Sequence, residues 1–286
     1  MADAANASGD IQMEDRKENS GIEIFDAHIH LYPDAIAPAC VPMLASRFGN
    51  AAAFDGTVPG ARRYAAGKGL KAMLNLPVAT KPAQVESINE WAAAINAEAD
   101  TISSLGTIHP DCNDCAAIIK HIADTGLRGI KMHPEYQQFT IDDVRMRPIY
   151  ETCSETGMVL YLHAGGERVF DAPFRSSPQT IAQLIDAYPD LTVVAAHLGG
   201  FSMWEESERF LIGKRIYLDL SHCFNWVDTD ERIVRMIRAH GVERIVFGSD
   251  GPWQDPNEIA NRFLEQPFTR DEQKAILHDN AMRLFR

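Results

Sequence analysis

The chain has 286 residues, of which 45% are hydrophobic and 23% are charged. This composition is ordinary for a soluble globular protein and excludes a wholly disordered or collagen-like chain. The formal net charge of −13 disfavours binding to nucleic acids and to anionic membranes, whose phosphates are also negative.

The chain begins with a polar stretch, residues 1–20, that has no basic start followed by an apolar run. We therefore expect a flexible tail there and no secretory signal. No apolar run approaches the roughly 20 residues that span a bilayer. The five cysteines are an odd number and cannot all pair within one chain. Together these features predict a cytoplasmic protein with reduced thiols.

From residue 21 onward, short apolar runs alternate with longer amphipathic segments. The apolar runs cover residues 22–30, 70–77, 103–110, 127–134, 158–166, 191–200, 215–222 and 243–252. Helical spacing marks the segments 81–100, 142–157, 177–190, 228–241 and 270–285. Eight strand–helix units predict a single (β/α)8 barrel, or TIM barrel, over residues 21–286. An open, doubly wound α/β sheet is the alternative.

Histidines gather at the C-terminal ends of the predicted strands. Seven of the ten lie there, namely His28, His30, His109, His133, His163, His197 and His222. The C-terminal rim is where barrels of this class carry their chemistry. Because alternate residues of a strand face the same side, His28 and His30 can hold one metal ion. Asp26 has the same parity and could orient one of these ligands from behind.

Other side chains at the predicted rim also suit a metal site. Lys131 bridges metal ions if it is carboxylated; otherwise its amine pairs with an anionic substrate, or reaches solvent or a carboxylate. Asp250, in GSDGPW, can bind a metal and take a proton from water, or it can cap the next helix. His163 and His197 each precede a glycine pair that lets a ligand approach the backbone.

These motifs, in this order, resemble the amidohydrolase superfamily and its amidohydrolase-2, or amidohydrolase-related, branch. The segments that carry the resemblance are FDAHIHLYPDAIA, GIKMHPEYQQF, AAHLGG, VFGSDGPW and the terminal NAMRLF. The resemblance implies one or two divalent metal ions, usually zinc. It makes His28, His30, His163 and Asp250 the metal ligands. His197 would then bind a second ion or polarise the substrate.

The resemblance leaves two reactions open. One is hydrolysis of a small amide, ester or lactone by metal-activated water, with Asp250 and His197 as catalytic residues. The other is non-oxidative decarboxylation of a small aromatic or unsaturated carboxylic acid. GIKMHPE is also similar to the urease strand that carries a carboxylated lysine. By that analogy Lys131 would bridge two metal ions and His133 would contact the substrate, which favours hydrolysis.

The remaining candidates carry weaker signals. Arg168 and Arg175, in the loop after the fifth apolar run, could bind a substrate carboxylate or be ordinary surface arginines. Cys112 and Cys115 form a C-x-x-C motif that indicates either redox or metal chemistry, or simply small buried thiols. A non-catalytic metal-binding barrel is a third hypothesis, which the histidine-rich rim disfavours. We expect a small-molecule substrate, and a homo-oligomer remains open.

Overall fold

The computed structural model describes residues 21–49, 51–98 and 100–286, so the predicted tail over residues 1–20 lies outside the described residues. All strand pairs in this part are parallel. The strands are β1 (Ile24–Ile29), β2 (Leu70–Asn75), β3 (Ile102–Ser104), β4 (Gly106–Thr107), β5 (Gly129–Met132), β6 (Val159–Leu162), β7 (Val193–Ala195), β8 (Tyr217–Asp219) and β9 (Ile245–Val246). Every predicted apolar run holds a strand, and the third run is divided between β3 and β4.

The strands close into a barrel through two junctions. β1, β2 and β3 form one parallel sheet, and β4 to β9 form a second one in chain order. At the first junction Leu105 N donates a hydrogen bond to Asn75 O at 3.0 Å. At the second, Ala27 N donates to Phe247 O at 2.8 Å, which joins the segment after β9 to β1. The predicted TIM barrel is therefore confirmed, and the open sheet is excluded.

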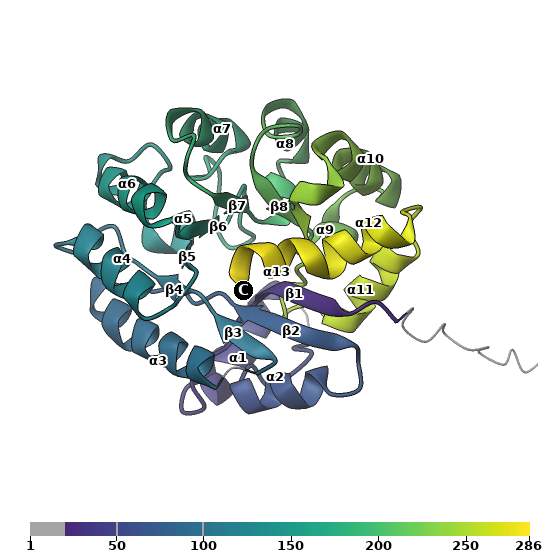
Figure 1. The fold of residues 1–286 in the computed structure, drawn as a ribbon, viewed down its shortest axis with the longest axis horizontal. Coiled ribbons are helices and arrows are strands. Elements are labelled where there is room, and N and C mark those ends of the chain that lie inside the picture. Colours follow the sequence, from purple (N-terminus) through teal and green to yellow (C-terminus); the bar gives the residue numbers. More distant parts are fainter. Residues whose placement is uncertain (1–20, 50, 99) are drawn as a thin grey trace, which may run out of the picture.

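Helices surround the barrel on its outside (Figure 1). They are α1 (Ala37–Phe48), α2 (Val58–Ala65), α3 (Val85–Ala97), α4 (Cys115–Asp124), α5 (Pro134–Gln137), α6 (Arg147–Thr156), α7 (Pro178–Ala187), α8 (Trp204–Phe210), α9 (Cys223–Trp226), α10 (Asp230–His240) and α11 (Pro256–Leu264). The helix starts follow local sequence. Ser177 accepts from Thr180 N and precedes Pro178 at the start of α7.

The C-terminal helix crosses one end of the barrel (Figure 1). It runs as α12 (Arg270–Lys274), a π-helical turn (Ala275–Asp279) and α13 (Asn280–Phe285). Within the π-helical turn, Ile276 O accepts a hydrogen bond from Phe247 N at 3.0 Å. Phe285 packs against the rings of Phe25 and Tyr161, at centroid distances of 6.4 and 6.1 Å. The helix thus covers the barrel beside the start of β1 and leaves the opposite end for chemistry.

The alternation of side chains along the strands places polar groups inside the barrel. In β5, Ile130 and Met132 belong to the apolar layer between strands and helices. Lys131, between them, therefore faces the interior, where it is 1% exposed. In β8, Leu218 joins the outer layer and the next residue, Asp219, is fully buried inside. The barrel interior thus carries charged groups, which require partners.

Candidate metal centre

The side chains that the sequence singles out lie where strands end. His28 is in β1 and His30 follows it, while Lys131 is in β5. The other predicted residues follow a strand within four positions: His133 after β5, His163 after β6, His197 after β7 and Asp250 after β9. These strand ends form the rim opposite to α13. The following distances establish which of them come together.

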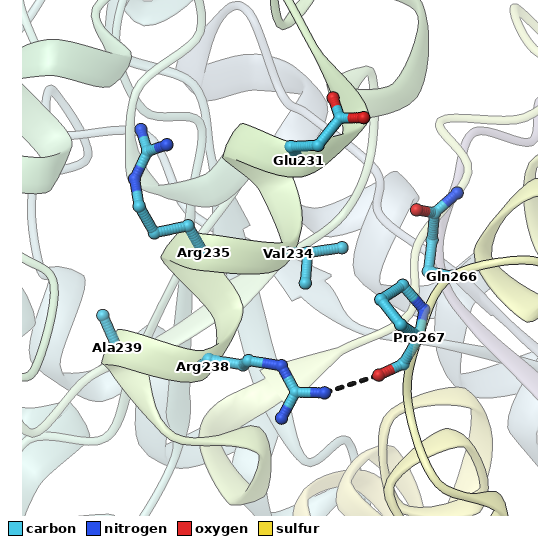
Figure 2. Close-up of a pocket in the computed structure, with 7 residues that line it drawn as sticks. All are labelled: Glu231, Val234, Arg235, Arg238, Ala239, Gln266 and Pro267. Carbon is cyan, nitrogen blue, oxygen red and sulfur yellow. Dashed lines mark hydrogen bonds between the residues drawn. The ribbon is translucent and has the colours of Figure 1, made fainter.

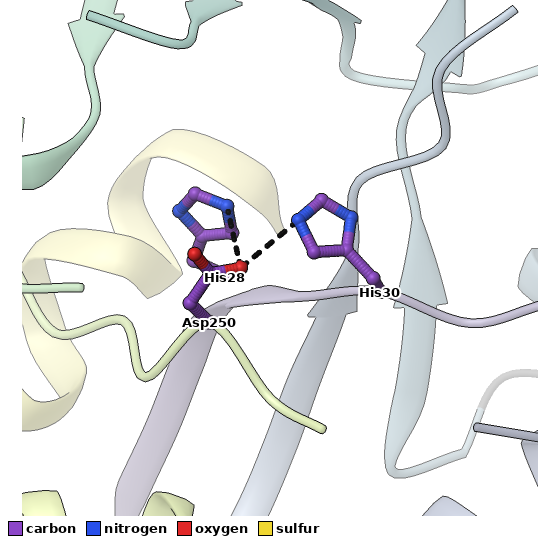
Figure 3. Close-up of side chains that lie close together, drawn as sticks. All are labelled: His28, His30 and Asp250. Carbon is purple, nitrogen blue, oxygen red and sulfur yellow. Dashed lines mark ion pairs between the residues drawn. The ribbon is translucent and has the colours of Figure 1, made fainter. Parts of the chain in front are cut away.

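His28, His30 and Asp250 form the tightest group (Figure 3). Asp250 Oδ1 lies 3.0 Å from His30 Nε2 and 3.6 Å from His28 Nε2. Candidate ligand atoms of the three residues lie within 4.8 Å of one another. Asp250 Oδ1 is nevertheless buried and without a hydrogen-bond partner among the described residues. Such an orphaned acceptor requires a ligand that the polypeptide does not supply.

The hydrogen bonds of the two Nδ1 atoms of His28 and His30 explain why Asp250 Oδ1 has no hydrogen-bond donor. His28 Nδ1 lies 2.7 Å from Asp219 Oδ2, and His30 Nδ1 lies 3.0 Å from Leu76 O. A carboxylate and a carbonyl can only accept, so each Nδ1 carries the proton. Each Nε2 then presents a lone pair toward Asp250 Oδ1. Three lone pairs that converge without a proton repel one another unless a cation lies among them.

Two further ring nitrogens without protons, on His163 and His197, lie beside this group. His163 Nε2 lies 2.8 Å from Gly166 O, and His197 Nδ1 lies 3.1 Å from Ser221 O. These carbonyls again require protonated nitrogens, so His163 Nδ1 and His197 Nε2 face each other as lone pairs at 3.1 Å. The ring of His197 lies 5.4 Å from the ring of His28. His163 nonetheless does not belong to the 4.8 Å group around Asp250.

Burial keeps the donor groups in the form that binds a cation. It lowers the pKa of His28 to about 4 and the pKa values of His163 and His197 well below their usual value, so these rings are neutral. Burial alone would raise the pKa of Asp250, but His222 and His28 lower it well below its usual value. Neutral imidazoles and one ionised carboxylate are the donor set that a divalent transition metal requires, and the residues fit such an ion.

Asp219 is a central residue that the sequence did not identify. Its carboxylate accepts five hydrogen bonds: from His28 Nδ1, Tyr161 OH, His197 N, and the backbone and hydroxyl of Ser221. Burial would raise its pKa, but His28, His197 and Ser221 lower the pKa below its usual range. Asp219 thus orients ligands from two strands. Asp219 and Ser221 alternate with leucines in the sequence, and this alternation is the pattern that could have identified Asp219.

Asp26, which we expected to orient a metal ligand, contacts His28 through the backbone N and not through the ring. The register of β1 against β2 shifts between Asp26 and Ile29, so strict alternation along β1 fails. Asp26 instead accepts from Ser249 N at 2.9 Å, from Ser249 Oγ at 2.5 Å and from the backbone N of His28 at 3.1 Å. It ties β1 to the loop that carries Asp250.

A second group of possible ligands lies beside the first and differs in geometry. His133, His163 and Glu167 also have candidate ligand atoms within 4.8 Å of one another. The rings of His133 and His163 are stacked, with centroids 3.9 Å apart and an interplanar angle of 14°. Lone pairs lie in the ring planes, so those of two stacked rings run parallel and do not converge. Glu167, which the sequence did not single out, has Oε2 3.4 Å from His133 Nε2.

The family model described as amidohydrolase matches residues 25–286. The chain belongs to the amidohydrolase family. The predicted resemblance is thereby confirmed. Among curated proteins, none matches the chain.

Solved structures with this fold include both uncharacterised proteins and decarboxylases. An uncharacterised TIM-barrel protein from Bordetella bronchiseptica is 21% identical, with a TM-score of 0.72 over 92% of this chain and 98% of that one. 5-Carboxyvanillate decarboxylase from Sphingomonas paucimobilis is 17% identical, with a TM-score of 0.69 over 92% and 99%. The same enzyme from Novosphingobium aromaticivorans, complexed with manganese and a nitrobenzoic acid, is 16% identical, with a TM-score of 0.69 over 93% and 96%. At these identities the likeness establishes the shared fold.

Lys131 lies beneath the rim of this amidohydrolase-family barrel. Its Nζ is 4.9 Å from the ring centre of Tyr161, and the residue is 1% exposed. Burial lowers the pKa of Lys131 to about 8. No hydrogen bond or ion pair joins Nζ to another described residue. The amine is therefore available to an anion or to carbon dioxide.

The two predicted substrate-binding arginines contact other residues. Arg168 stacks its guanidinium 4.4 Å from the ring centre of Trp226, which is 38% exposed at the mouth. Arg175 pairs through Nε with Oε2 of Glu135 at 3.4 Å, and its backbone N donates to Oε1 of the same residue at 2.6 Å. Arg175 thus anchors its loop onto buried Glu135, whereas Arg168 stays at the entrance.

The cysteine motif lies apart from the metal ligands. Cys112 and Cys115 are free thiols, and Cys115 Sγ donates to His109 O at 3.6 Å. Burial raises the pKa of Cys115 to about 11, which suppresses the thiolate that redox and metal chemistry need. The hypothesis of small buried thiols describes this motif best.

A groove on the outer surface does not contribute to the centre. It lies along α10 and the segment after α11 (Figure 2). Its arginines are already engaged, because Arg238 donates to Pro267 O and Arg235 pairs with Glu208 at 2.9 Å.

Among the described residues, no helix has the length and apolar character needed to cross a membrane.

Proposed function

We propose that this protein is a metal-dependent hydrolase of a small amide, ester or lactone. One divalent cation would bind to His28, His30, His163 and Asp250. The supporting observation is that backbone and carboxylate acceptors fix the protons on the far side of the His28 and His30 rings, which leaves unprotonated lone pairs around a buried, unpartnered carboxylate oxygen. His163 would reach the group by a rotation of its ring that gives up its hydrogen bond to Gly166 O.

A divalent cation held there supplies a Lewis acid for a carbonyl oxygen and lowers the pKa of water toward about 7. Three imidazoles and one carboxylate suit zinc. Manganese is the alternative, because the related decarboxylase structure carries it.

Two side chains supply the proton-transfer steps. Asp250 Oδ1 and His197 Nε2 are both unprotonated and both face the centre. Ser221 O fixes the proton of His197 on Nδ1, so Nε2 accepts a proton rather than donating one. We expect His197 to take the proton of the attacking water and to return it to the leaving group. Asp250 then remains the ionised ligand and the alternative base.

The side of the site that carries His133 would bind the substrate. His133 Nδ1 is buried and has no hydrogen-bond partner among the described residues, so it is free for a substrate group. The ammonium of Lys131 lies in the same strand and would stabilise negative charge on that group. Arg168 at the entrance offers a further cation for a substrate carboxylate.

Non-oxidative decarboxylation is the second candidate. It is favoured by the shared fold of three structures of aromatic-acid decarboxylases. The same residues would serve, with His133 and Lys131 near the substrate carboxylate and His197 handling the proton that replaces carbon dioxide.

Metal reconstitution with two product assays tests the proposal. The protein is stripped with a chelator, reloaded with zinc or manganese, and offered esters, lactones and amides beside hydroxybenzoates. Metal-dependent release of acid from the first set supports hydrolysis. Carbon dioxide from the second set without any hydrolysis would overturn hydrolysis in favour of decarboxylation. A chain that binds neither metal would contradict both functions.

Lys131 decides whether a second cation binds. A bridging role requires carboxylation, which only the neutral amine undergoes. With a pKa lowered to about 8, the amine is largely neutral at pH 9. We propose that a second ion binds only when Lys131 is carboxylated. The number of metal ions per chain, measured at pH 9 with 13C-bicarbonate for the wild type and for Lys131→Met, tests this proposal. A second ion bound by Lys131→Met would contradict the bridging role.

A further inference from the structure

We propose that Gln254 and His222 are positioning residues for Asp250. His222 holds Oδ2 of Asp250 so that Oδ1 faces the cation, and Gln254 holds the other nitrogen of the His222 ring. The inference rests on the proposed function, since it concerns the carboxylate ligand. It adds two residues that the predicted ligand set does not contain.

A hydrogen-bond chain joins Gln254, His222 and Asp250. Gln254 Nε2 lies 2.6 Å from His222 Nδ1. On the other side of the ring, a carboxylate oxygen can only accept a hydrogen bond. His222 Nε2 lies 2.7 Å from Asp250 Oδ2, so it donates to that oxygen. One carboxylate oxygen is occupied by a donor, while the other is left to the cation.

The backbone shows that this contact is built into the fold. His222 and Asp250 have left-handed φ values of 59° and 67°, which residues other than glycine rarely adopt. They follow two neighbouring strands, β8 and β9, and their side chains turn toward each other from these unusual conformations. Two such residues joined by a short hydrogen bond are typical of a functional constraint.

The surroundings restrict the ring to this orientation. The side chain of His222 is 12% exposed and that of Asp250 is 8% exposed. The ring of His222 lies 5.5 Å from that of Phe201 and 5.4 Å from that of His197. Gln254 is 5% exposed, and its Oε1 has no partner among the described residues. Gln254 is thus buried beside the His222 ring, to which it is hydrogen-bonded.

Three variants separate positioning from mere space filling. His222→Gln keeps an amide NH2 at a reach similar to that of Nε2, whereas His222→Met fills similar volume and cannot donate. Gln254→Leu keeps Asp250 and His222 and removes the hydrogen bond on the other side of the His222 ring. Thermal unfolding of each metal-free variant shows whether the fold is kept.

Zinc affinity is measured by competition with a chromophoric chelator. We expect His222→Met and Gln254→Leu to bind zinc about 10–100-fold more weakly than the wild type, and His222→Gln within about threefold. Equal affinity for His222→Met and the wild type would overturn the inference. So would a His222→Gln variant as weak as His222→Met. If His222→Met does not fold, Gln254→Leu decides by itself, because wild-type affinity there overturns the inference.

Nitrogen-15 spectra of the histidines provide a readout without metal or substrate. In the metal-free wild type, His222 is expected to show a proton on Nε2 that is hydrogen-bonded to Asp250. A ring without a proton on Nε2 in the wild type would overturn the inference. A wild type that has the expected tautomer yet binds no zinc would contradict the proposed function instead.

Discussion

Two neighbouring groups at the rim have similar composition and different geometry. The first group, His28, His30 and Asp250, and the second group, His133, His163 and Glu167, each bring three possible ligands within 4.8 Å. In the first, lone pairs converge on one carboxylate oxygen. In the second, two rings are stacked at 14° and their lone pairs run parallel. Proximity alone therefore does not define a metal site; the direction of the unprotonated lone pairs does.

The groups also differ in what supports them. The first is fixed from behind, because His28 is held by Asp219 and His30 by Leu76 O. In the second group, His133 Nδ1 is buried without a partner among the described residues. A supported site suits a resident ion, whereas an open donor suits a substrate that comes and goes.

The largest effect is expected from Asp250→Asn. The amide keeps the shape of the side chain but loses the charge that binds a cation and the ability to accept a proton. We expect activity to fall by roughly 10²–10⁴-fold. Steady-state assays with saturating zinc measure it. Asp186→Asn, an exposed carboxylate paired with Lys214, is the matched control. Full activity in Asp250→Asn would mean that the first group is not the catalytic centre.

Asp219→Asn is expected to weaken the support of the first group. It removes the charge that accepts from His28 and Tyr161, so the free energy of unfolding should fall by roughly 1.5–3 kcal/mol. Zinc affinity should fall about 10–100-fold. Chemical denaturation and chelator competition measure these two quantities. Unchanged zinc affinity in a destabilised variant would make Asp219 a purely structural residue.

The same variant has a pH signature. The pKa of folded Asp219 is lowered below its usual value of 3.8, so its contribution to stability is present above pH 3.8 and is lost as the pH falls through the folded pKa. The difference in unfolding free energy between wild type and Asp219→Asn should therefore be constant at neutral pH and should decrease as the pH falls below 3.8. A difference that widens in acid would contradict the assigned charge state.

The sequence predicts the fold well because the strands are buried on both faces. The eight apolar runs therefore identify every strand, although the polar ends of the runs belong to loops. The site is predicted less completely. His28, His30 and Asp250 follow from spacing and strand ends, whereas Asp219 pairs with His28 across 191 residues, which no local pattern reveals. The register shift in β1 likewise changes which atoms Asp26 contacts, because alternation holds only in regular strands.

Glu167→Gln probes the second group. If this group is a substrate wall, the variant should raise KM severalfold and leave zinc affinity within about threefold of the wild type, since no ligand of the first group is lost. Substrate kinetics and chelator competition are compared on the same preparation. Loss of one of two bound ions in this variant would instead make the second group a metal site.

The smallest effect is expected from Cys112→Ser and Cys115→Ser. Neither thiol contacts the first group, so metal content and activity should stay within about twofold of the wild type. With the pKa of Cys115 raised to about 11, alkylation by iodoacetamide at pH 8 should be slow and should accelerate as the pH rises toward that value. Rapid alkylation at pH 8 would show that this thiol is ionised, contrary to its burial.

The most direct measurement is anomalous diffraction from crystals of the zinc-loaded protein, combined with elemental analysis of zinc per chain. We predict one strong peak bonded to His28, His30, His163 and Asp250, with His163 turned away from His133. A peak between His133, His163 and Glu167 alone, or a chain that takes up no zinc, would contradict the central claim that the converging lone pairs mark the cation site.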